Sequence, residues 1–499
     1  MSKSKERDCR RFFEIVPGFL SWGIIFSLVF LSIVFPVACA IIIISFDFYW
    51  IIRTVYLTTL LIMAHHQIFR QKGRNWLELC LRLDARRGWP DLRQLVIFPV
   101  CNEGPEVLRP SLEALRASRY PKDKFIVVMA FEERNPYAHE NAALLEKEFG
   151  SCFGSYLSTF HPDGLPGEGR TKGANATWGA REAKKLLDSR KIGYEHAIVS
   201  CFDADTCVDP EYFGCLSYHF LVSDKPHQAS YQPMPVYNNN IWQAPSFARL
   251  IEISSSFCQM IESMRLEKFV TFSSHSMSFK TLVEVDYWPR NMVSDDSVIY
   301  WKGFLHYNGD YRVIPLYITV SMDVAYSSNI FKTIIVQYKQ KRRWAWGVEN
   351  FPFVATRLVK NSNIGLFRKT RRLFHLLESH VTWAVWAVIL VLIGPLPIFF
   401  GGRFFSQTAL AYNLPKITGI LFQFTLFTSL TWIFLSWTIL PPRPRGIGWF
   451  KNIILVLEWF FVPGIILVVG SFPALDAQSR LMLARYMEFN PTLKGNKVL

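Results

Sequence analysis

Cysteine and charged residues are both scarce in this chain of 499 residues, and several familiar motifs are missing. The nine cysteines are scattered, none follows Cys258, and no two have CxxC spacing, which argues against a disulfide framework and against a zinc site. Neither GxGxxG nor GxxxxGK[ST] occurs, so a dinucleotide-binding enzyme and a P-loop NTPase are both disfavoured. Reduced thiols in a cytosolic domain are the simplest interpretation of these cysteines.

The composition favours a folded membrane protein. Hydrophobic residues make up 50% and aromatic residues 15% of the chain, while charged residues make up only 19%, which excludes disorder as the main state. Lys and Arg number 55 against 40 for Asp and Glu, so the formal charge is +15. Excess positive charge beside long apolar runs favours an integral membrane protein with a basic cytoplasmic surface over a soluble enzyme or a nucleic-acid-binding protein.

Apolar runs at both ends of the chain predict membrane helices. The run 19–46 carries no charge and is long enough to span the hydrocarbon core of a bilayer, and the run 48–64, which contains Arg53, is a weaker second span. The later candidates are 381–400, 417–440 and 453–471, which gives four or five spans. A broken or re-entrant helix is open for the last of these, because Pro463 and Gly464 lie in its middle.

Basic residues around these runs predict their orientation. The residues Lys3, Lys5, Arg7, Arg10 and Arg11 favour a cytoplasmic N-terminus, and two spans then return the chain to the cytoplasm before the middle domain. A cleaved signal peptide ending near Ala38-Cys39-Ala40 is disfavoured because the apolar run is too long. Arg443, Arg445 and Lys451 place a late loop inside, but a basic tail (Arg480, Arg485, Lys494, Lys497) conflicts with a full final span.

The middle of the chain alternates strand-like and helix-like segments. Apolar runs at 95–100, 125–130, 156–159 and 197–202 predict strands, and 108–117, 138–149 and 173–188 predict helices, as in an α/β domain with a parallel sheet. Ligands of such sheets bind beyond the carboxyl ends of the strands. The polar residues at those ends are Asn102, Glu103, Glu132, Asp203 and Asp205.

The pair Asp203 and Asp205 follows the last of these strands directly. Two carboxylates at a strand end can hold a divalent ion that bridges to a nucleotide diphosphate. A plain acidic turn, or a helix N-cap before Pro210, explains the same residues equally simply. A DxD sequence alone therefore does not decide between the two interpretations.

Five motifs in sequence order resemble those of the family 2 glycosyltransferases, in particular the membrane-embedded, processive polysaccharide synthases (cellulose, chitin and hyaluronan synthase-like). The motifs are Pro99-Val100-Cys101-Asn102-Glu103, Lys172-Gly173-Ala174-Asn175, Asp203-Ala204-Asp205, Ser294-Asp295-Asp296 and Gln340-Lys341-Arg342-Arg343-Trp344, the last of which matches QxxRW. The catalytic resemblance covers about 95–350. Two segments depart from the family pattern: the second strand ends in Glu132-Glu133, and the acceptor-side segment around His275 lacks glycine.

The resemblance implies an α/β GT-A cytosolic domain, with a Rossmann-like mixed sheet, joined to an α-helical transmembrane bundle of four or five spans. The expected units are N-terminal transmembrane helices at 1–64, the GT-A domain at 65–330, interfacial helices with QxxRW at 331–375, C-terminal transmembrane helices at 376–475 and a tail at 476–499. From Lys339 to Arg372 the chain carries many basic residues and one acid, Glu349, which is typical of a segment on an anionic membrane surface.

The implied activity is inverting sugar transfer from a nucleoside-diphosphate sugar, expected to be a UDP-sugar, with Mg²⁺ or Mn²⁺ held by Asp205 and Asp203. Asp296 is the expected base, with a pKa raised by its neighbour Asp295, although helix capping is an alternative role for either carboxylate. The other expected contacts to the nucleotide sugar are Pro99, Asn102, Glu103, Glu132, Lys172, Asp203, Arg342 and Arg343. The expected contacts to the acceptor are Trp344, His275, Ser276 and Gln340.

Three functions remain in competition from the sequence. The first is synthesis of a polysaccharide that is exported through the enzyme's own spans, which QxxRW favours. The second is a single addition of sugar to a lipid carrier. The third is a membrane transporter with a regulatory cytosolic domain, which is disfavoured because the apolar runs hold few ionisable groups, namely Arg53 and Glu458. The sugar, the linkage and the acceptor are not determined by these motifs.

Overall fold

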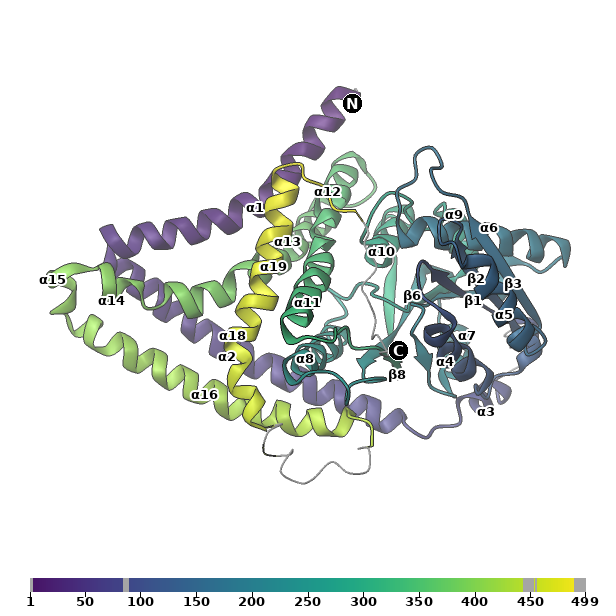
Figure 1. Cartoon of the computed structure of the whole chain (residues 1–499). Coiled ribbons are helices and arrows are strands. Elements are labelled where there is room, and N and C mark those ends of the chain that lie inside the picture. The colour runs from purple at the N-terminus through teal and green to yellow at the C-terminus, as the bar shows by residue number, and fades with distance from the viewer. Residues whose placement is uncertain (1–2, 84–88, 443–452, 454–455, 489–499) are drawn as a thin grey trace.

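The computed structural model describes residues 3–83, 89–442, 453 and 456–488, which form a mixed α/β domain and a helical bundle (Figure 1). The strands are β1 (Arg93–Val100), β2 (Phe125–Glu132), β3 (Ser155–His161), β4 (Ala197–Cys201), β5 (Cys207–Val208), β6 (Ala229–Tyr237), β7 (Ser276–Ser278) and β8 (Arg312–Met322). The helices of the α/β domain are α3 (Trp76–Leu81), α4 (Pro105–Arg116), α5 (Ala138–Phe149), α6 (Lys172–Ser189), α7 (Tyr212–Val222), α8 (Ser246–Ser263), α9 (Phe279–Glu284) and α10 (Asp295–His306). The other helices are α1 (Lys3–Val34), α2 (Pro36–Gln71), α11 (Ile330–Ala345), α12 (Asn350–Lys360), α13 (Leu366–Val388), α14 (Leu396–Phe400), α15 (Gly402–Ser406), α16 (Ala409–Ile439), α18 (Val462–Ile465) and α19 (Phe472–Met482).

The sheet explains why a continuous apolar run, rather than an alternating one, marks each strand. Its eight strands have the order β3-β2-β1-β4-β7-β6-β8-β5, with β1, β2, β3 and β4 mutually parallel and β7 antiparallel to both β4 and β6. Helices cover both faces, so successive residues of β1 enter different cores: Leu95 and Ile97 enter one, Val96 and Phe98 the other. The expected strands and helices of the middle domain all lie at the predicted positions.

The N-terminal apolar runs divide differently from the sequence prediction. The run 19–46, expected to be a single span, is broken at Phe35, where α1 ends and Pro36 begins α2. Proline is favoured at the first position of a helix because it has no N–H to leave unpaired there. The two helices form a hairpin whose turn lies at the far end of the bundle from the sheet (Figure 1). The second helix continues through the weaker run 48–64 to Gln71.

Five helical stretches within the described residues are long and apolar enough to cross a membrane: Ser4–Val34, Pro36–Gln71, Leu366–Ile393, Ala409–Ile439 and Glu458–Met482. The third begins at Leu366, so the expected boundary of the interfacial segment at 375 falls within α13. Pro463 and Gly464 do not interrupt the last stretch, which continues from a short 3₁₀ turn through a π-helical segment into α19. Of the basic residues used to orient the late loop and tail, Arg443, Arg445, Lys451, Lys494 and Lys497 lie outside the described residues.

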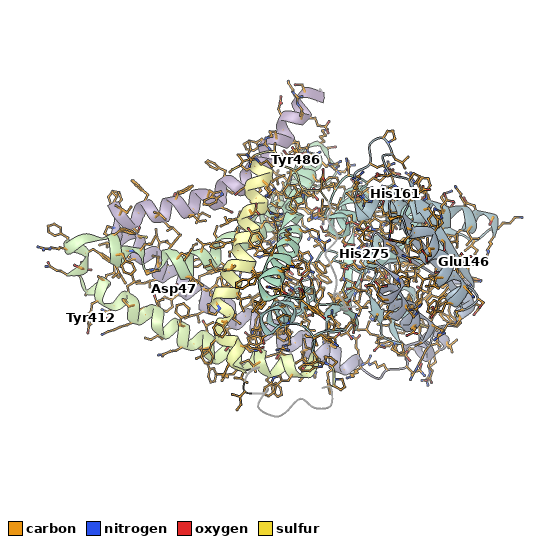
Figure 2. All side chains as sticks on the ribbon, in the orientation of Figure 1. Asp47, Glu146, His161, His275, Tyr412 and Tyr486 are labelled. Carbon is orange, nitrogen blue, oxygen red and sulfur yellow. The ribbon has the colours of Figure 1, made fainter. Side chains whose placement is uncertain are left out.

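Asp47 is a buried acid of the bundle that lies between the two N-terminal apolar runs of the sequence prediction. Asp47 of α2 is 3% exposed, and the hydroxyl of Thr418 on α16 donates a hydrogen bond to it over 3.2 Å. Figure 2 places Asp47 within the helices, away from the sheet. Closer to the sheet, Arg53 forms an ion pair with Glu378 of α13 at 3.2 Å, and Glu378 also pairs with Lys268 at 3.0 Å. These contacts join α2 to α16, to α13 and to the α/β domain.

Candidate functional site

Three motifs that are far apart in sequence meet at the carboxyl end of β4. The ammonium of Lys172 lies 2.7 Å from Asp203 Oδ1, and 2.9 and 3.0 Å from the two carboxylate oxygens of Asp296. The Lys172 side chain is 9% exposed, and the two carboxylates are 26% and 23% exposed. Burial lowers the pKa of Lys172, but the charges of Asp203 and Asp296 outweigh it and hold the pKa well above its ordinary value. This cluster is the centre of the candidate active site.

Two residues of the Lys172-Gly173-Ala174-Asn175 motif place that lysine. The side-chain amide of Asn175 donates to the carbonyls of Val100 (3.1 Å) and Ala130 (2.6 Å), which fixes the start of α6 across the ends of β1 and β2. A Cβ at Gly173 would lie 2.4 Å from the carbonyl oxygen of Pro289, so only glycine allows this close approach. The motif therefore has a structural role that brings Lys172 to the two carboxylates.

Asp203 and Asp205 have different environments although they are two residues apart. Asp203 Oδ2 accepts from the hydroxyl of Ser273 at 2.6 Å, whereas Asp205 is 2% exposed and its Oδ2 accepts from the backbone N–H of Asp323 at 2.8 Å. Asp323, which follows β8, brings a third acid to the pair, and its position was not predicted from the sequence. The signal in the sequence that could have found Asp323 is its place directly after a strand.

The donor set suits a divalent ion that is shared with a ligand. Mg²⁺ is usually held by one or two carboxylates together with water and phosphate oxygens, and Mn²⁺ also prefers oxygen ligands. In the described part of the chain, no group of three or more His, Cys, Asp or Glu side chains is arranged to hold a metal by itself. Asp203 and Asp205 therefore fit the metal only together with a diphosphate that supplies further oxygens.

The neighbouring acids Asp295 and Asp296 begin α10 but are not equivalent. Burial, followed by the charge of Asp296, raises the pKa of Asp295 well above its ordinary value, and its Oδ2 is buried without a hydrogen-bond partner in the described structure. The raised pKa was expected on Asp296 and lies instead on its neighbour. The N-cap of α10 is Ser294, and Asp296 pairs with Lys172, which argues against a capping role for Asp296.

Glu349 connects this segment to the QxxRW helix. Its Oε1 accepts from the N–H groups of Val293 (2.9 Å) and Ser294 (2.8 Å) and from the Ser294 hydroxyl (2.8 Å). Burial raises the pKa of Glu349, and these hydrogen bonds oppose the shift. In the sequence, Glu349 stands out as the single acid in the basic stretch from Lys339 to Arg372. An acid that is alone among basic residues is a candidate for a specific hydrogen-bonding role, and this was the signal that could have found it.

Arg342 and Arg343 face different sides of α11. Burial lowers the pKa of Arg343, while the carboxylates of Asp203 and Asp296 oppose that shift, so this guanidinium faces the candidate site. Arg342 instead forms an ion pair with Asp476 on α19 at 2.8 Å. Consecutive residues of a helix are about 100° apart, which explains the difference. The expectation that Arg342 contacts the nucleotide is therefore not supported by its position.

Trp344 and Gln340 complete the helix face that lies near the site. Trp344 packs against Tyr237 (ring centroids 5.7 Å apart) and edge-on against Phe272 (5.5 Å), with the Lys341 ammonium 3.6 Å from its ring centroid. It therefore belongs to the α/β domain and not to a lipid-facing belt. Gln340 is 5% exposed, and its side-chain carbonyl is buried without a partner in the described residues, so it can accept a hydrogen bond from a bound molecule.

His275 and Ser276, expected to bind the acceptor, are both fully buried. The Ser276 hydroxyl bonds to those of Ser200 (2.7 Å) and Tyr212 (2.9 Å) inside the core. Trp288 donates its indole N–H to His275 Nε2 over 3.3 Å, and Nδ1 lies 3.1 Å from the Phe272 carbonyl oxygen and 3.6 Å from Asp296 Oδ1. Burial lowers the pKa of His275, and both ring nitrogens already face partners within the protein, so its position does not support the expected contact with an acceptor.

The ends of β1 and β2 hold the remaining expected residues. Pro99 lies within β1, and Asn102 is exposed just beyond it, while Glu103 Oε2 accepts from the backbone N–H groups of Cys101 (2.8 Å) and Asn102 (3.1 Å). Asn102 is thus the residue of this group that is free to contact a ligand without rearrangement.

Glu132, expected to contact the nucleotide sugar, is buried in a network that holds the loop after β3. It is 4% exposed and lies 3.4 Å from His161 Nδ1, whose Nε2 is 2.9 Å from Glu168. Glu168 also pairs with Arg290 at 3.2 Å. Burial lowers the pKa of His161, but its hydrogen bonds with Glu132 and Glu168 outweigh that effect and raise it. The network ties the loop after β3 to the segment before α10.

A family model supplies the identification, since the model described as "Glycosyl transferase family group 2" matches residues 198–463, more than half of the chain. This chain belongs to that family. The matched range contains the DxD pair, the Ser-Asp-Asp segment and QxxRW, and it extends into the apolar helices. The chain is therefore a glycosyltransferase, and the fold expected from the sequence, a GT-A domain with apolar helices, is confirmed.

Several solved structures are similar to this glycosyltransferase. The mannosyltransferase PcManGT from Pyrobaculum calidifontis, in complex with GDP-Man and Mn²⁺, is 14% identical with a TM-score of 0.41, over 77% of this chain and 98% of its own. Residues 1–349 of S. aureus TarS are 14% identical with a TM-score of 0.40, and the match covers 70% of this chain and 90% of the TarS fragment. The same TarS fragment in complex with UDP-GlcNAc is 13% identical, with the same TM-score and coverage. No curated protein matches the chain.

Proposed function

We propose that this glycosyltransferase is an inverting, membrane-anchored enzyme that moves sugar from a nucleoside-diphosphate sugar, expected from the family resemblance to be a UDP-sugar, to a growing polysaccharide. The observation that carries the proposal is the convergence of Asp203, Asp296 and Lys172 within 3.0 Å contacts beneath the QxxRW helix. QxxRW accompanies the processive members in the family resemblance described above. The glycan acceptor then lies on the side of Asp296 that Trp344 and Gln340 border.

The chemistry requires a base, a stabilised leaving group and a positioned acceptor. The acceptor hydroxyl oxygen forms a bond to the anomeric carbon, and the bond from that carbon to the diphosphate oxygen breaks with its electron pair leaving on the diphosphate. Asp296 takes the hydroxyl proton, since its carboxylate remains 23% exposed and faces the cluster. Lys172 and Arg343 place two positive charges where the diphosphate gains negative charge.

A divalent ion held by Asp205 and Asp203 would supply further charge stabilisation of the leaving diphosphate. The sites of these two acids support that role, because Asp205 is fixed by the Asp323 N–H and Asp203 is fixed by Ser273. Mg²⁺ and Mn²⁺ both suit these oxygen ligands. The residues of this chain would then bind and orient the donor and the acceptor, and exclude water from around the reacting groups.

The proposed location is an integral membrane protein of the cell membrane with its catalytic domain in the cytoplasm, where activated nucleotides occur. The α1–α2 hairpin supports this, because both ends of the hairpin lie on the side of the sheet (Figure 1). The basic residues at the start of α1 favour the same side.

The experiment that tests the function is a donor panel. Purified full-length protein in detergent or nanodiscs is incubated with separate nucleoside-diphosphate sugars and Mg²⁺ or Mn²⁺, with and without a lipid-phosphate acceptor, and the products are sized. Chains of increasing length support the polysaccharide proposal. Product of one added sugar on the lipid supports single addition instead, and no transfer with any donor contradicts both.

Exchange of Arg343 for Lys should lower transfer roughly tenfold, because lysine keeps the charge but loses the planar fork that binds two phosphate oxygens. Initial rates with the active donor measure the effect. The matched control is Lys339→Met, which removes a charge from an exposed position of the same helix. Equal rates for the Arg343 variant and the control would remove Arg343 from the donor site.

A further inference from the structure

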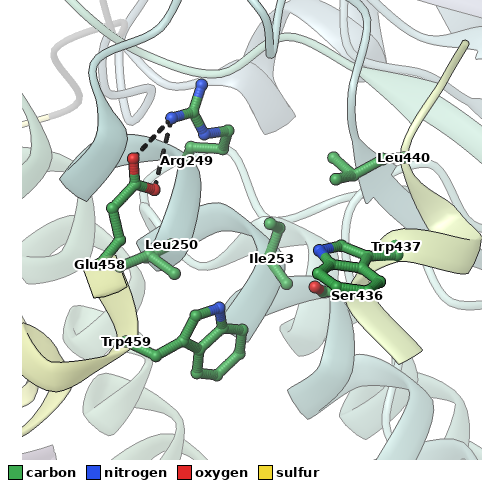
Figure 3. A pocket seen from close by; sticks show the side chains of 8 residues that line it. All are labelled: Arg249, Leu250, Ile253, Ser436, Trp437, Leu440, Glu458 and Trp459. Carbon is green, nitrogen blue, oxygen red and sulfur yellow. Dashed lines mark hydrogen bonds and ion pairs between the residues drawn. The ribbon is translucent and has the colours of Figure 1, made fainter. Parts of the chain in front are cut away.

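The last apolar stretch, Glu458–Met482, has both of its ends on the side of the α/β domain. At its start, Arg249 of α8 pairs with Glu458 at 3.0 Å, and the two side chains are 12% and 8% exposed. Figure 3 shows this pair at one side of a pocket that Trp437 of α16 and Trp459 also line. The start of the stretch is therefore anchored to the catalytic domain.

The other end of the stretch lies against the charged start of α1. Arg11 donates from Nη1 to the carbonyl of Leu481 over 2.9 Å and from Nη2 to that of Met482, and the Tyr486 hydroxyl donates to Glu14 over 2.9 Å. Arg11 lies near the N-terminal end of α1, far from the Phe35 turn where that helix ends. A helix that crossed the bilayer from Glu458 would instead bring Met482 close to that turn.

Figure 1 shows the same arrangement as a whole. Helices α1, α2 and α16 converge toward the end of the bundle where α14 and α15 lie, whereas α18 and α19 pass across the bundle toward the N-terminus. A stretch of 25 residues is about 37 Å long as a helix, which is enough to cross a bilayer. Its length therefore does not decide its direction, but the contacts at its two ends do.

The stretch has one protein-facing side and one apolar exposed side. Ser471 bonds to the Trp383 carbonyl (3.0 Å), and Gln478 bonds to Ser21 (2.6 Å) and to the His380 carbonyl (2.8 Å). Exposed apolar side chains recur at spacings of about one or two turns on another side: Leu457 (51%), which directly precedes the stretch, and Phe461 (69%), Val468 (42%) and Phe472 (37%) within it. An amphipathic helix of this kind buries its apolar side at the boundary of headgroups and acyl chains.

Asp476 connects this stretch to the QxxRW helix. Its carboxylate accepts from Arg342 (2.8 Å), from the Tyr338 hydroxyl (3.3 Å) and from Arg480 of its own helix (2.7 Å). Arg342 and Tyr338 both lie on α11, one residue and five residues before Arg343. The ion pair thus sets the rotation and position of the helix that carries Arg343 toward the cluster.

We infer that Glu458–Met482 is not a fifth span but a helix lying along the membrane surface on the catalytic side, with the lipid surface as its partner, and that Asp476 is a positioning residue for α11. Four helices then cross the membrane: Ser4–Val34, Pro36–Gln71, Leu366–Ile393 and Ala409–Ile439. The start of α1 and the end of α19 then lie on the same side of the membrane. The positioning role of Asp476 rests on the proposed function, whereas the direction of the helix does not.

Cysteine labelling of intact and permeabilised cells tests the direction of the helix. Single substitutions Arg7→Cys, Phe404→Cys and Arg485→Cys place thiols at exposed positions, Phe404 being 94% exposed in α15, and the unsubstituted protein gives the background of its own cysteines. With a membrane-impermeant maleimide, Arg7→Cys and Arg485→Cys should behave alike and Phe404→Cys oppositely, while permeabilisation exposes all three. Matching behaviour of Phe404→Cys and Arg485→Cys would overturn the inference, whichever side proves to be the cytoplasm.

Transfer kinetics test the positioning role. Asp476→Asn should lower kcat roughly three- to tenfold at an unchanged KM for the donor, since members of one ion-pair network are energetically coupled, and Asp476→Glu should restore most of the rate. Arg485→Met, which removes an exposed charge just after α19 and no contact to Asp476, is the matched control and should leave the rate unchanged. Full activity of Asp476→Asn would overturn the positioning role. If the positioning role of Asp476 is wrong, the donor-panel result is unaffected, because that experiment uses the unsubstituted enzyme.

Discussion

Replacement of Asp296 by Asn should slow sugar transfer by at least ~10²-fold while donor binding survives, because a general base contributes about 10²–10⁴-fold to the rate. Asparagine keeps the size of the side chain and removes its ability to take a proton. It also removes one of the two carboxylates that hold Lys172, so a small change in donor affinity should accompany the loss. Single-turnover rates and calorimetric titration with the nucleoside diphosphate and Mg²⁺ measure the two effects separately.

Asp295→Asn is the matched control for that variant. Asp295 is 2% exposed, and burial raises its pKa well above the ordinary value, so a neutral asparagine of the same size suits its surroundings better than it suits those of Asp296. We expect a rate within a few-fold of the unsubstituted enzyme. Equal and mild losses for both variants, with matching falls in melting temperature, would show that the two acids only stabilise α10.

Removal of the divalent ion should abolish transfer, and Asp205→Asn should have nearly the same effect. The amide oxygen can still accept from the Asp323 N–H, so the fold around Asp205 is retained while the charge that attracts the ion is lost. Loss of a Lewis acid on a diphosphate leaving group costs several kcal/mol, which corresponds to at least ~10²-fold in rate. Metal titrations followed by rate, with chelator and re-addition of Mg²⁺ or Mn²⁺, measure it.

A shift of the metal dependence to higher concentration in Asp205→Asn supports the assignment, and the exposed acid variant Glu133→Gln should show no shift. Transfer that continues undiminished after complete chelation would contradict metal use altogether. Asp205→Asn with the metal dependence of the unsubstituted enzyme would show that other residues hold the ion.

The sequence predicted the layered domain well because its strands are buried on both faces. Continuous apolar runs such as 95–100 and 125–130 mark such strands whatever surrounds them. Apolar runs did not predict the ends of the first membrane helices, because the only residue in the uncharged run 19–46 that indicates a turn is Pro36. The turn is determined by one proline within an otherwise uniform apolar segment.

The sequence predicted the site residues that belong to recognisable motifs. It did not predict the direction of side chains that depends on which helices pack beside them. Lys172, Asp203 and Asp296 were selected from the sequence and lie together. Arg342 could not be separated from Arg343 without knowing what packs against each side of α11. The roles predicted for Glu132 and His275 stay predictions. Sequence could not show that both are buried and that partners from distant segments, His161 and Trp288, already contact their polar atoms.

The short turn at Phe35 also limits how much of this enzyme would be exposed on the side of the membrane away from the sheet. One residue separates α1 from α2, and the other connection at that end comprises α14, α15 and the few residues beside them. In the proposed topology, an antibody, protease or inhibitor arriving from that side would find, among the described residues, a small surface around Phe35 and Phe404, which are 56% and 94% exposed. We therefore expect agents that act on this enzyme to reach it through the bilayer or from the side of its sheet.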